Sequence, residues 1–352
     1  MSEICYTTRE RVKRALDSAE TARNNREVAE AIAAATPEIE SLCHRVFYPW
    51  TGTHYFDWPA EDPGRSWVLR LGEHDLISTT TITSGGVGIA PADYFLRPDD
   101  GPPYTRVEID LDSSSSWGAV GTHQRAISIV GEWGYTAQTA PAGTLDVAVV
   151  NTTATSIAVT DGAAIGVGDI ITIDSERMIV TEKTMLATGL TLAAPDLTAS
   201  AANTAITMSG IVDTPVIDEI IQIGAEWMLV VGVSGTALVV RRAWDGTVLA
   251  AHTAGVGTGI SAPRTLTVER GILGSTAATH LIAAPIIRHR PPPLVRKLAV
   301  ALSMDTLLQE GAGYARISGS GESAREYWGK ALDTLRERVY DAHGRKLRHR
   351  AV

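Results

Sequence analysis

Two glutamates and two histidines recur at matched positions, and these four side chains are the first candidates for chemistry. Glu176 and Glu226 occupy the same place in two similar segments, and His252 and His280 occupy the same place in two others. Side chains of these types can act in catalysis or bind a metal ion, but no cluster of further ligands accompanies them. Because the positions are repeated, we interpret the four residues first as structure that two related modules share.

A glycine-containing loop near the C-terminus is a candidate anion site. Gly319, Ser320 and Gly321 precede an expected helix, whose N-terminus could hold an anion. Ser323 and Glu326 follow in the spacing of a capping box, in which side chains of the chain itself satisfy that helix end. The loop is therefore expected to be a linker that ends in a helix cap.

Two aspartates near the middle of the first β-rich stretch are a candidate calcium site. Asp110 and Asp112 precede a run of serines, but the remaining ligands of a calcium loop are absent from the sequence. A solvated strand end is the favoured interpretation. The sequence also lacks a P-loop, zinc-ligand spacing and a nucleophile elbow. The motif search therefore predicts no enzyme activity, no cofactor and no metal site.

Residues 336 to 350, called the basic end below, stand out from an otherwise acidic protein. The chain of 352 residues has a formal net charge of −9, which does not indicate a general nucleic-acid binder. Six cations gather at this end, namely Arg336, Arg338, Arg345, Lys346, Arg348 and Arg350. They could form a solvated helix end, where positive charge suits the helix dipole, or a surface that binds a partner or DNA.

Composition places the chain among water-soluble globular proteins. It has 44% apolar and 20% charged residues, and its length is sufficient for two or three domains. Cys5 and Cys43 are its only cysteines, so a disulfide scaffold is not expected and a reduced, cytoplasmic place of synthesis is. We expect no signal peptide and no membrane span, because no apolar run has the required length.

Both ends of the chain are predicted to be helical. A capping-box pattern begins at Thr7, and a long amphipathic helix follows Asn25, with Pro37 expected to kink or split it. Two further helices follow the proline run 291–293 and the glycine loop 319–321. Each of these helices has only one apolar face, so we expect them to pack together into one domain.

The stretch between the helical ends alternates apolar and polar residues as strands do. Residues 47 to 135 predict a small antiparallel sheet of about four strands. From residue 140 to about 285 the sequence repeats: 169–180 matches 219–230 at an offset of fifty, and 238–242 matches 266–270. We therefore predict two related β modules, each a small sandwich or barrel, inserted before the C-terminal helices.

Short motifs stand in a fixed order on both sides of the β modules. They are FYPWTG (47–52), YFDWP (55–59), PYTRVEI (103–109), GEWGY (131–135), LLQE (307–310), GYAR (313–316) and YDAHG (340–344). Together with the terminal helices, this order resembles the head-to-tail connector, or adaptor, family of long-tailed bacteriophages. The resemblance covers residues 1–135 and about 290–345, and the β modules depart from the compact helical adaptors of that family.

With this resemblance, the predicted fold class is α+β. Residues 1–139 and 287–352 are expected to form a helical connector domain with a small antiparallel sheet. Residues 140–286 are expected to form an inserted all-β domain of two repeats, about 140–209 and 210–286.

The resemblance implies a structural virion protein and not an enzyme. It implies a homo-oligomeric ring, expected to be a dodecamer, between the portal protein and the head-closure or tail-terminator protein. Viral DNA would pass non-specifically through its lumen, at the head–tail interface of the virion, after assembly in the host cytoplasm. In related connectors the C-terminal segment reaches toward the portal, so the six cations of the basic end are predicted to bind the portal.

Two other classes of function remain as alternatives. One is a surface- or carbohydrate-binding protein of a phage tail, built on the β modules. Exposed aromatic residues at matched positions of both modules would favour it, but only Trp227 and Trp244 are candidates, and neither has an aromatic counterpart. The other is a hydrolase with a dispersed site, against which the lack of a nucleophile–base pair counts.

Overall fold

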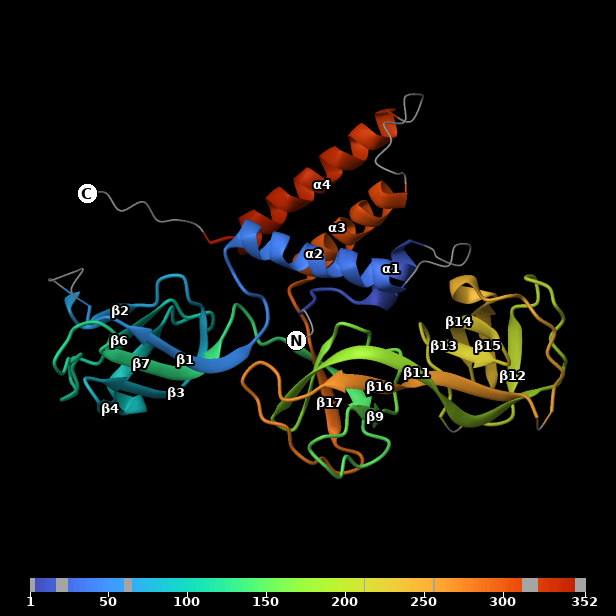
Figure 1. Ribbon diagram of the computed structural model, residues 1–352, viewed down its shortest axis with the longest axis horizontal. Coiled ribbons are helices and arrows are strands. Elements are labelled where there is room, and N and C mark those ends of the chain that lie inside the picture. Colours follow the sequence, from blue (N-terminus) through green and yellow to red (C-terminus); the bar gives the residue numbers. More distant parts are fainter. Residues whose placement is uncertain are drawn as a thin grey trace.

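Figure 1 shows a computed structural model of the chain, which describes residues 4–16, 25–59, 65–211, 213–255, 257–311 and 322–345. Its helices lie above three groups of strands. The helices are α1 (Arg9–Ala15), α2 (Asn25–Cys43), α3 (Pro293–Gly311) and α4 (Glu322–His343), with short 3-10 turns η2 (Pro91–Asp93) and η3 (Trp244–Gly246). The strands before the β modules are β1 (Trp50–Phe56), β2 (Val68–Arg70), β3 (Leu76–Ser84), β4 (Val87–Ile89), β5 (Tyr94–Arg97), β6 (Arg106–Ile109) and β7 (Ile127–Trp133). Those of the modules are β8 (Thr139–Thr144), β9 (Ser156–Ala158), β10 (Ile170–Ile173), β11 (Glu176–Ala193), β12 (Ala205–Met208), β13 (Ile220–Ile223), β14 (Glu226–Ser234), β15 (Ala237–Arg241), β16 (Gly259–Glu269) and β17 (Pro285–His289).

The predicted fold class, a helical connector domain with a small sheet and an inserted all-β domain, is wrong. Among the residues that the structure describes, strands hold 37% and helices only 21%, and the largest sheet has ten strands. The strand patterns before residue 135 form two sheets instead of one, with strand orders β1-β7-β3-β4 and β2-β6-β5. The helical periodicity at the chain ends therefore marks real helices, but these helices cover a protein that is mostly β.

Helices from both chain ends pack on each other. Apolar side chains of α2, α3 and α4 share one core, which contains Ala35, Ile39, Cys43, Val295, Leu298, Ala299, Leu302, Leu332, Leu335 and Val339. The amphipathic helix α2 runs unbroken through Pro37, where a kink or a split was expected. Figure 1 shows α2, α3 and α4 side by side above the strands.

The two N-terminal sheets enclose a second core. Inward-facing residues alternate along β7, which lies between β1 and β3, and the side chains of Ile127, Ile129 and Trp133 are almost fully buried. Residues of the smaller sheet, among them Leu69, Val107 and Ile109, belong to the same core.

In the ten-stranded sheet, paired strands form two closed rings. These rings are two small barrels that share the long strands β11 and β16. One closed path runs through β11, β12, β15, β14, β13 and β16, because β11 and β16 also pair with each other. The other runs through β8, β17, β10, β11, β16 and β9, where a bridge between Leu145 and Val159 completes it. Each barrel has its own apolar core.

The two barrels are nested in the chain. Residues 142–180 and 266–286 form one core, here called the outer module, and residues 190–260 form the other, the nested module. The sequence-based boundary near residue 210 lies inside the nested module and does not separate the two cores. Both modules pair their first hairpin in the same register: Ile173 lies opposite Glu176 in one, and Ile223 lies opposite Glu226 in the other.

Candidate functional site

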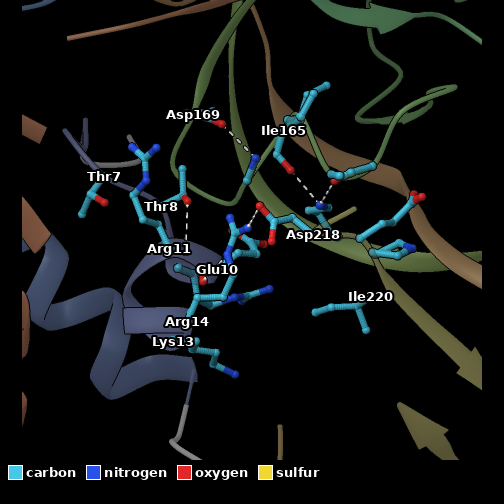
Figure 2. Close-up of a pocket in the computed structure, with 18 of the residues that line it drawn as sticks. Thr7, Thr8, Glu10, Arg11, Lys13, Arg14, Ile165, Asp169, Asp218 and Ile220 are labelled. Atoms are coloured by element: carbon cyan, nitrogen blue, oxygen red, sulfur yellow. Dashed lines mark hydrogen bonds and ion pairs between the residues drawn. The ribbon is translucent and has the colours of Figure 1, made fainter. Parts of the chain in front are cut away.

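Helix α1 lies against a charged cleft that both modules and the start of α3 line (Figure 2). Thr8 is the N-cap, and its Oγ1 accepts a hydrogen bond from the backbone N–H of Arg11 at 3.3 Å. Glu10, which the capping-box pattern assigned to the helix end, instead accepts a hydrogen bond from the N–H of Val167 at 2.9 Å. Glu10, the acidic residue of the sequence motif, therefore holds α1 on the outer module.

Ion pairs join α1 to the shared strand β11 and to the nested module. They are Arg9 Nη1 with Glu182 Oε2 at 2.9 Å, Lys13 Nζ with Asp245 Oδ2 at 2.6 Å and Arg14 Nη1 with Asp218 Oδ2 at 2.8 Å. Burial alone would raise the pKa of Glu182, but the hydrogen bonds from Arg9 and from the backbone N–H of Lys183 lower it. Of the three pairs, Lys13–Asp245 is the most enclosed, with side chains only 8% and 11% exposed.

The cleft has a volume of about 570 Å³, within the range of small-molecule sites. Lys183 projects into it from β11, and its Nζ donates hydrogen bonds to the carbonyl oxygens of Gly162 and Ile165. Burial lowers the pKa of Lys183. At another part of the cleft, Arg11, Arg288 and Arg296 approach one another, although they come from widely separated parts of the chain.

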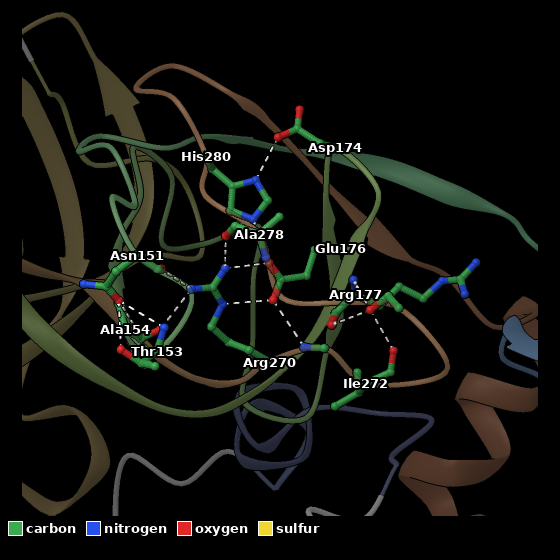
Figure 3. Close-up of polar contacts among 12 residues, drawn as sticks. Asn151, Thr153, Ala154, Asp174, Glu176, Arg177, Arg270, Ile272, Ala278 and His280 are labelled. Atoms are coloured by element: carbon green, nitrogen blue, oxygen red, sulfur yellow. Dashed lines mark hydrogen bonds and ion pairs between the residues drawn. The ribbon is translucent and has the colours of Figure 1, made fainter.

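The repeated glutamates and histidines lie in two equivalent buried networks, away from this cleft. In the outer module (Figure 3), Arg270 Nε donates to Glu176 Oε1 at 2.9 Å, and His280 Nε2 lies 2.9 Å from Glu176 Oε2. The backbone N–H groups of Gly271 and Ala278 also donate to Glu176. Hydrogen bonds from these groups outweigh burial, so the pKa of Glu176 is lowered.

The nested module repeats this network. Arg242 Nε and Nη2 each donate to Glu226 at 2.7 Å, and His252 Nε2 lies 2.9 Å from Glu226 Oε2. Backbone N–H groups of Ala243 and Ala250 complete the set. Burial would raise the pKa of Glu226, but these hydrogen bonds lower it to about 2.

The equivalence of the two networks favours a structural role. Glu176 and Glu226 are both fully buried, and each interacts with one arginine and one histidine of its own module. Each arginine also donates to backbone carbonyl oxygens of distant loops: Arg270 to Asn151, and Arg242 to Thr198. A fully hydrogen-bonded network of this kind fixes loop positions inside a small β barrel.

The other candidate ion sites give a plainer result. Asp110 Oδ1 accepts a hydrogen bond from the N–H of Asp112 at 3.0 Å, as in a local turn. Among the residues that the structure describes, no group of three or more His, Cys, Asp or Glu side chains could hold a metal ion. The loop of Gly319 to Gly321 lies outside the described residues.

The basic end is only partly described, and its described arginines differ in surroundings. Arg345 donates to the carbonyl oxygens of Gly72 and Glu73 at 2.8 Å and pairs with Asp75 at 3.0 Å. Arg336 pairs with Glu38 of α2 at 2.8 Å. The remaining described cation of this end, Arg338, is exposed on α4, whereas Lys346, Arg348 and Arg350 lie outside the described residues.

The tryptophans of the nested module do not form an exposed platform. Trp244 is 2% exposed, and the guanidinium carbon of Arg241 lies 5.5 Å from the centre of its ring. Trp227 is half-buried and lines the charged cleft. In the described parts of the chain, no helix is long and apolar enough to cross a membrane.

Three of the motifs that carry the family resemblance meet in space, although they are far apart in the sequence. Phe47, Tyr135 and His343 pack together, with ring centroids 5.2 Å apart for Phe47–Tyr135 and 5.5 Å apart for Tyr135–His343. The hydroxyl of Tyr135 lies 3.1 Å from His343 Nδ1, and the guanidinium of Arg45 lies 4.8 Å from the Tyr135 ring centre. This aromatic junction joins α4 to the chain between α2 and β1.

Comparison with known proteins gives no relative: no family model, no curated protein and no solved structure matches this chain.

Proposed function

We propose that this protein is a structural component of a bacteriophage virion, a head-to-tail connector that forms a ring between the portal and the head-closure or tail proteins. The observation that carries the proposal is the aromatic junction of Phe47, Tyr135 and His343. Each of these residues belongs to a different motif of the resemblance, and motifs that belong to one functional unit are expected to meet in the fold.

We assign the subunit contacts to the layer formed by α2, α3 and α4, called the helical layer here. Its inner faces are used within the chain, yet Leu308 of α3 and Tyr340 of α4 remain 46% and 37% exposed. A ring requires each subunit to present two different surfaces to its neighbours, and a layer at one side of the molecule can do so. The β modules would then lie on the side of the ring away from this layer (Figure 1).

We assign the portal contact to Arg338 and to the cations after residue 345. Arg336 and Arg345 are less suitable than the sequence suggested, because Glu38 and Asp75 already pair with them. An acidic portal surface would attract the remaining cations, most strongly at low salt. DNA in the lumen is the competing target, and binding there would also weaken with salt.

The test of the ring is cross-linking within assembled phage particles, followed by mass spectrometry. We expect cross-links between copies of this chain that join α3 or α4 to a different surface of a neighbour. An immunogold label against the chain should mark the neck between head and tail. A label at the tail tip, with no link between copies, would contradict the proposal and favour the surface-binding alternative.

A further inference from the structure

Four arginines converge at one part of the charged cleft. Arg11 comes from α1, Arg288 from β17, Arg290 from the position directly after β17, and Arg296 from the first turns of α3. All four line the cleft, and Arg11, Arg288 and Arg290 are each close enough to Arg296 to lower its pKa. We call these four residues the arginine cluster.

The cluster has an excess of positive charge that the chain itself does not balance. Its acidic neighbour is Asp169, whose Oδ2 lies 3.6 Å from Arg288 Nη1 and also accepts a hydrogen bond from the N–H of Gly166. In the described parts of the chain, Arg11, Arg290 and Arg296 have no ion pair. Burial and the neighbouring arginines lower the pKa of Arg296 to about 10, and burial and Arg288 lower that of Arg11.

Two buried donors in the cluster have no acceptor. The Nε atoms of Arg288 and Arg296 are buried and lack any hydrogen-bond partner in the structure. A buried donor without an acceptor costs about 1 to 3 kcal/mol, and more when the group is charged. By contrast, Arg9, Lys13 and Arg14 on the same helix are all paired with carboxylates. The chemistry of the cluster therefore suits an acceptor with negative charge.

We propose that the arginine cluster binds a phosphate-type oxyanion. Guanidinium groups match phosphate oxygens with parallel N–H···O bonds, and several of them can surround one tetrahedral anion. Bound there, the anion joins α1, β17 and α3, which are the elements that hold the β modules against the helical layer. The ligand is either free phosphate or a phosphate group of DNA, and this site does not depend on the connector proposal.

The test compares phosphate with chloride at constant ionic strength, by thermal unfolding and by calorimetric titration of inorganic phosphate. We expect phosphate to raise the Tm of the wild-type chain, and Arg290→Gln and Arg296→Gln to weaken phosphate binding at least about tenfold. Without phosphate, Arg296→Gln should unfold at the same or a higher temperature than the wild type, because it removes like-charge repulsion. Arg70→Gln, at an exposed position of β2 away from the cleft, is the matched control and should bind phosphate as the wild type does.

A second arm identifies the source of the phosphate group. Fluorescence anisotropy with a short duplex DNA, in the presence and absence of inorganic phosphate, measures competition for the cluster. DNA binding that phosphate and Arg296→Gln both abolish assigns the site to DNA, whereas phosphate binding without DNA binding assigns it to the free anion. A Tm that does not respond to phosphate, or that responds equally in wild type and Arg296→Gln, would overturn the proposal.

Discussion

The outer and nested modules have the same interior but use an equivalent loop to contact different parts of the protein. This loop follows the network arginine, at residues 271–275 in the outer module and 243–247 in the nested module. In both, a hydroxyl fixes the loop in the same way: Ser275 Oγ accepts from the N–H of Arg177, and Thr247 Oγ1 accepts from that of Trp227. We call these two segments the docking loops.

The docking loop of the outer module contacts the N-terminal sheet. The carbonyl oxygen of Leu273 accepts a hydrogen bond from the N–H of Thr51 on β1 at 2.9 Å. Arg177 forms an ion pair with Glu132 of β7 and donates to Thr51 Oγ1. The outer module is thereby fixed to β1 and β7.

The docking loop of the nested module contacts α1 instead. Asp245, which stands where the outer module has Leu273, pairs with Lys13 of α1 at 2.6 Å. The backbone of both residues is left-handed, with φ of 53° at Asp245 and 55° at Leu273. The comparison shows that the buried network preserves the loop shape, while the side chains on the loop determine what each module contacts.

The largest expected effect is the loss of either network glutamate. Glu176→Gln and Glu226→Gln each leave a buried arginine without its full charge partner, and breaking a buried pair costs about 3 to 5 kcal/mol. We expect the two variants to reduce the free energy of unfolding in urea by similar amounts. If one variant were harmless, the two networks would not be equivalent.

Lowering the pH should remove the stabilisation that the Glu226 carboxylate provides, over a defined pH range. The pKa of Glu226 is about 2 in the folded chain and 4.5 without its partners, so its stabilisation is complete above about pH 4.5. It is lost as the pH falls through 2. The difference in unfolding free energy between wild type and Glu226→Gln should therefore be constant near neutral pH and shrink below pH 4.5. Urea titrations at several pH values measure this, and a difference independent of pH would contradict the account.

A pair of glycine substitutions separates docking from loop strain. Gly274 and Gly246 occupy equivalent places with φ of 78° and 76°, so alanine at either costs about 1 to 2 kcal/mol of backbone strain. A Cβ at Gly274 would also lie 1.9 Å from the carbonyl oxygen of Thr51, which adds about 1 to 3 kcal/mol. Gly274→Ala should be the more destabilising variant and should raise hydrogen exchange in β1. Equal effects would show that the β1 contact is unimportant.

The smallest effect concerns the one residue that distinguishes the two networks. Asp174 Oδ2 lies 2.7 Å from His280 Nδ1, whereas the nested module has Gly224 at the matching place. Asp174 is 59% exposed, so Asp174→Asn should cost only about 0.2 to 1 kcal/mol. A Cβ at Gly224 would stand 3.6 Å from His252 Cε1, but Gly224 has a left-handed φ of 59°, so backbone strain in Gly224→Asp should offset most of the gain from the added contact. Urea unfolding measures both, and a loss for Asp174→Asn as large as that for Glu176→Gln would break the comparison.

The sequence predicted the elements of the modules better than their arrangement. Matching strands were found because the repeated segments alternate apolar residues in the same register. The nesting was missed, although its signal was present: residues 169–180 of the outer module precede their match, whereas residues 266–270 follow theirs. Two tandem copies would keep one order throughout, so this reversal indicates that one copy lies within the other.

The charged sites could be predicted only in part, because sequence spacing does not show which side chains meet. The sequence shows the basic end as a run of cations, but the ion pair between Arg345 and Asp75 depends on the tertiary fold. The arginine cluster has no local signature at all, since Arg11 and Arg296 are brought together by helices from opposite ends of the chain. Glu10 likewise matched a capping box, yet a nearby backbone N–H of the outer module is its partner.

The most direct test of this account is to remove the nested module at the point where it interrupts the outer one. Thr184 pairs with Thr265, as Ser234 pairs with Ala237 around the two-residue turn of the nested hairpin. Replacing residues 185–264 with Gly-Thr should therefore close β11 and β16 into an equivalent hairpin.

Hydrogen-exchange mass spectrometry of this variant should show peptides 169–184 and 265–280 as protected as in the full chain. Deleting residues 210–286, the tandem repeat expected from the sequence, serves as the control and should leave peptide 169–184 unprotected, because it removes β16 and the start of β17. Loss of protection in the first variant, or its retention in the control, would contradict the nested arrangement.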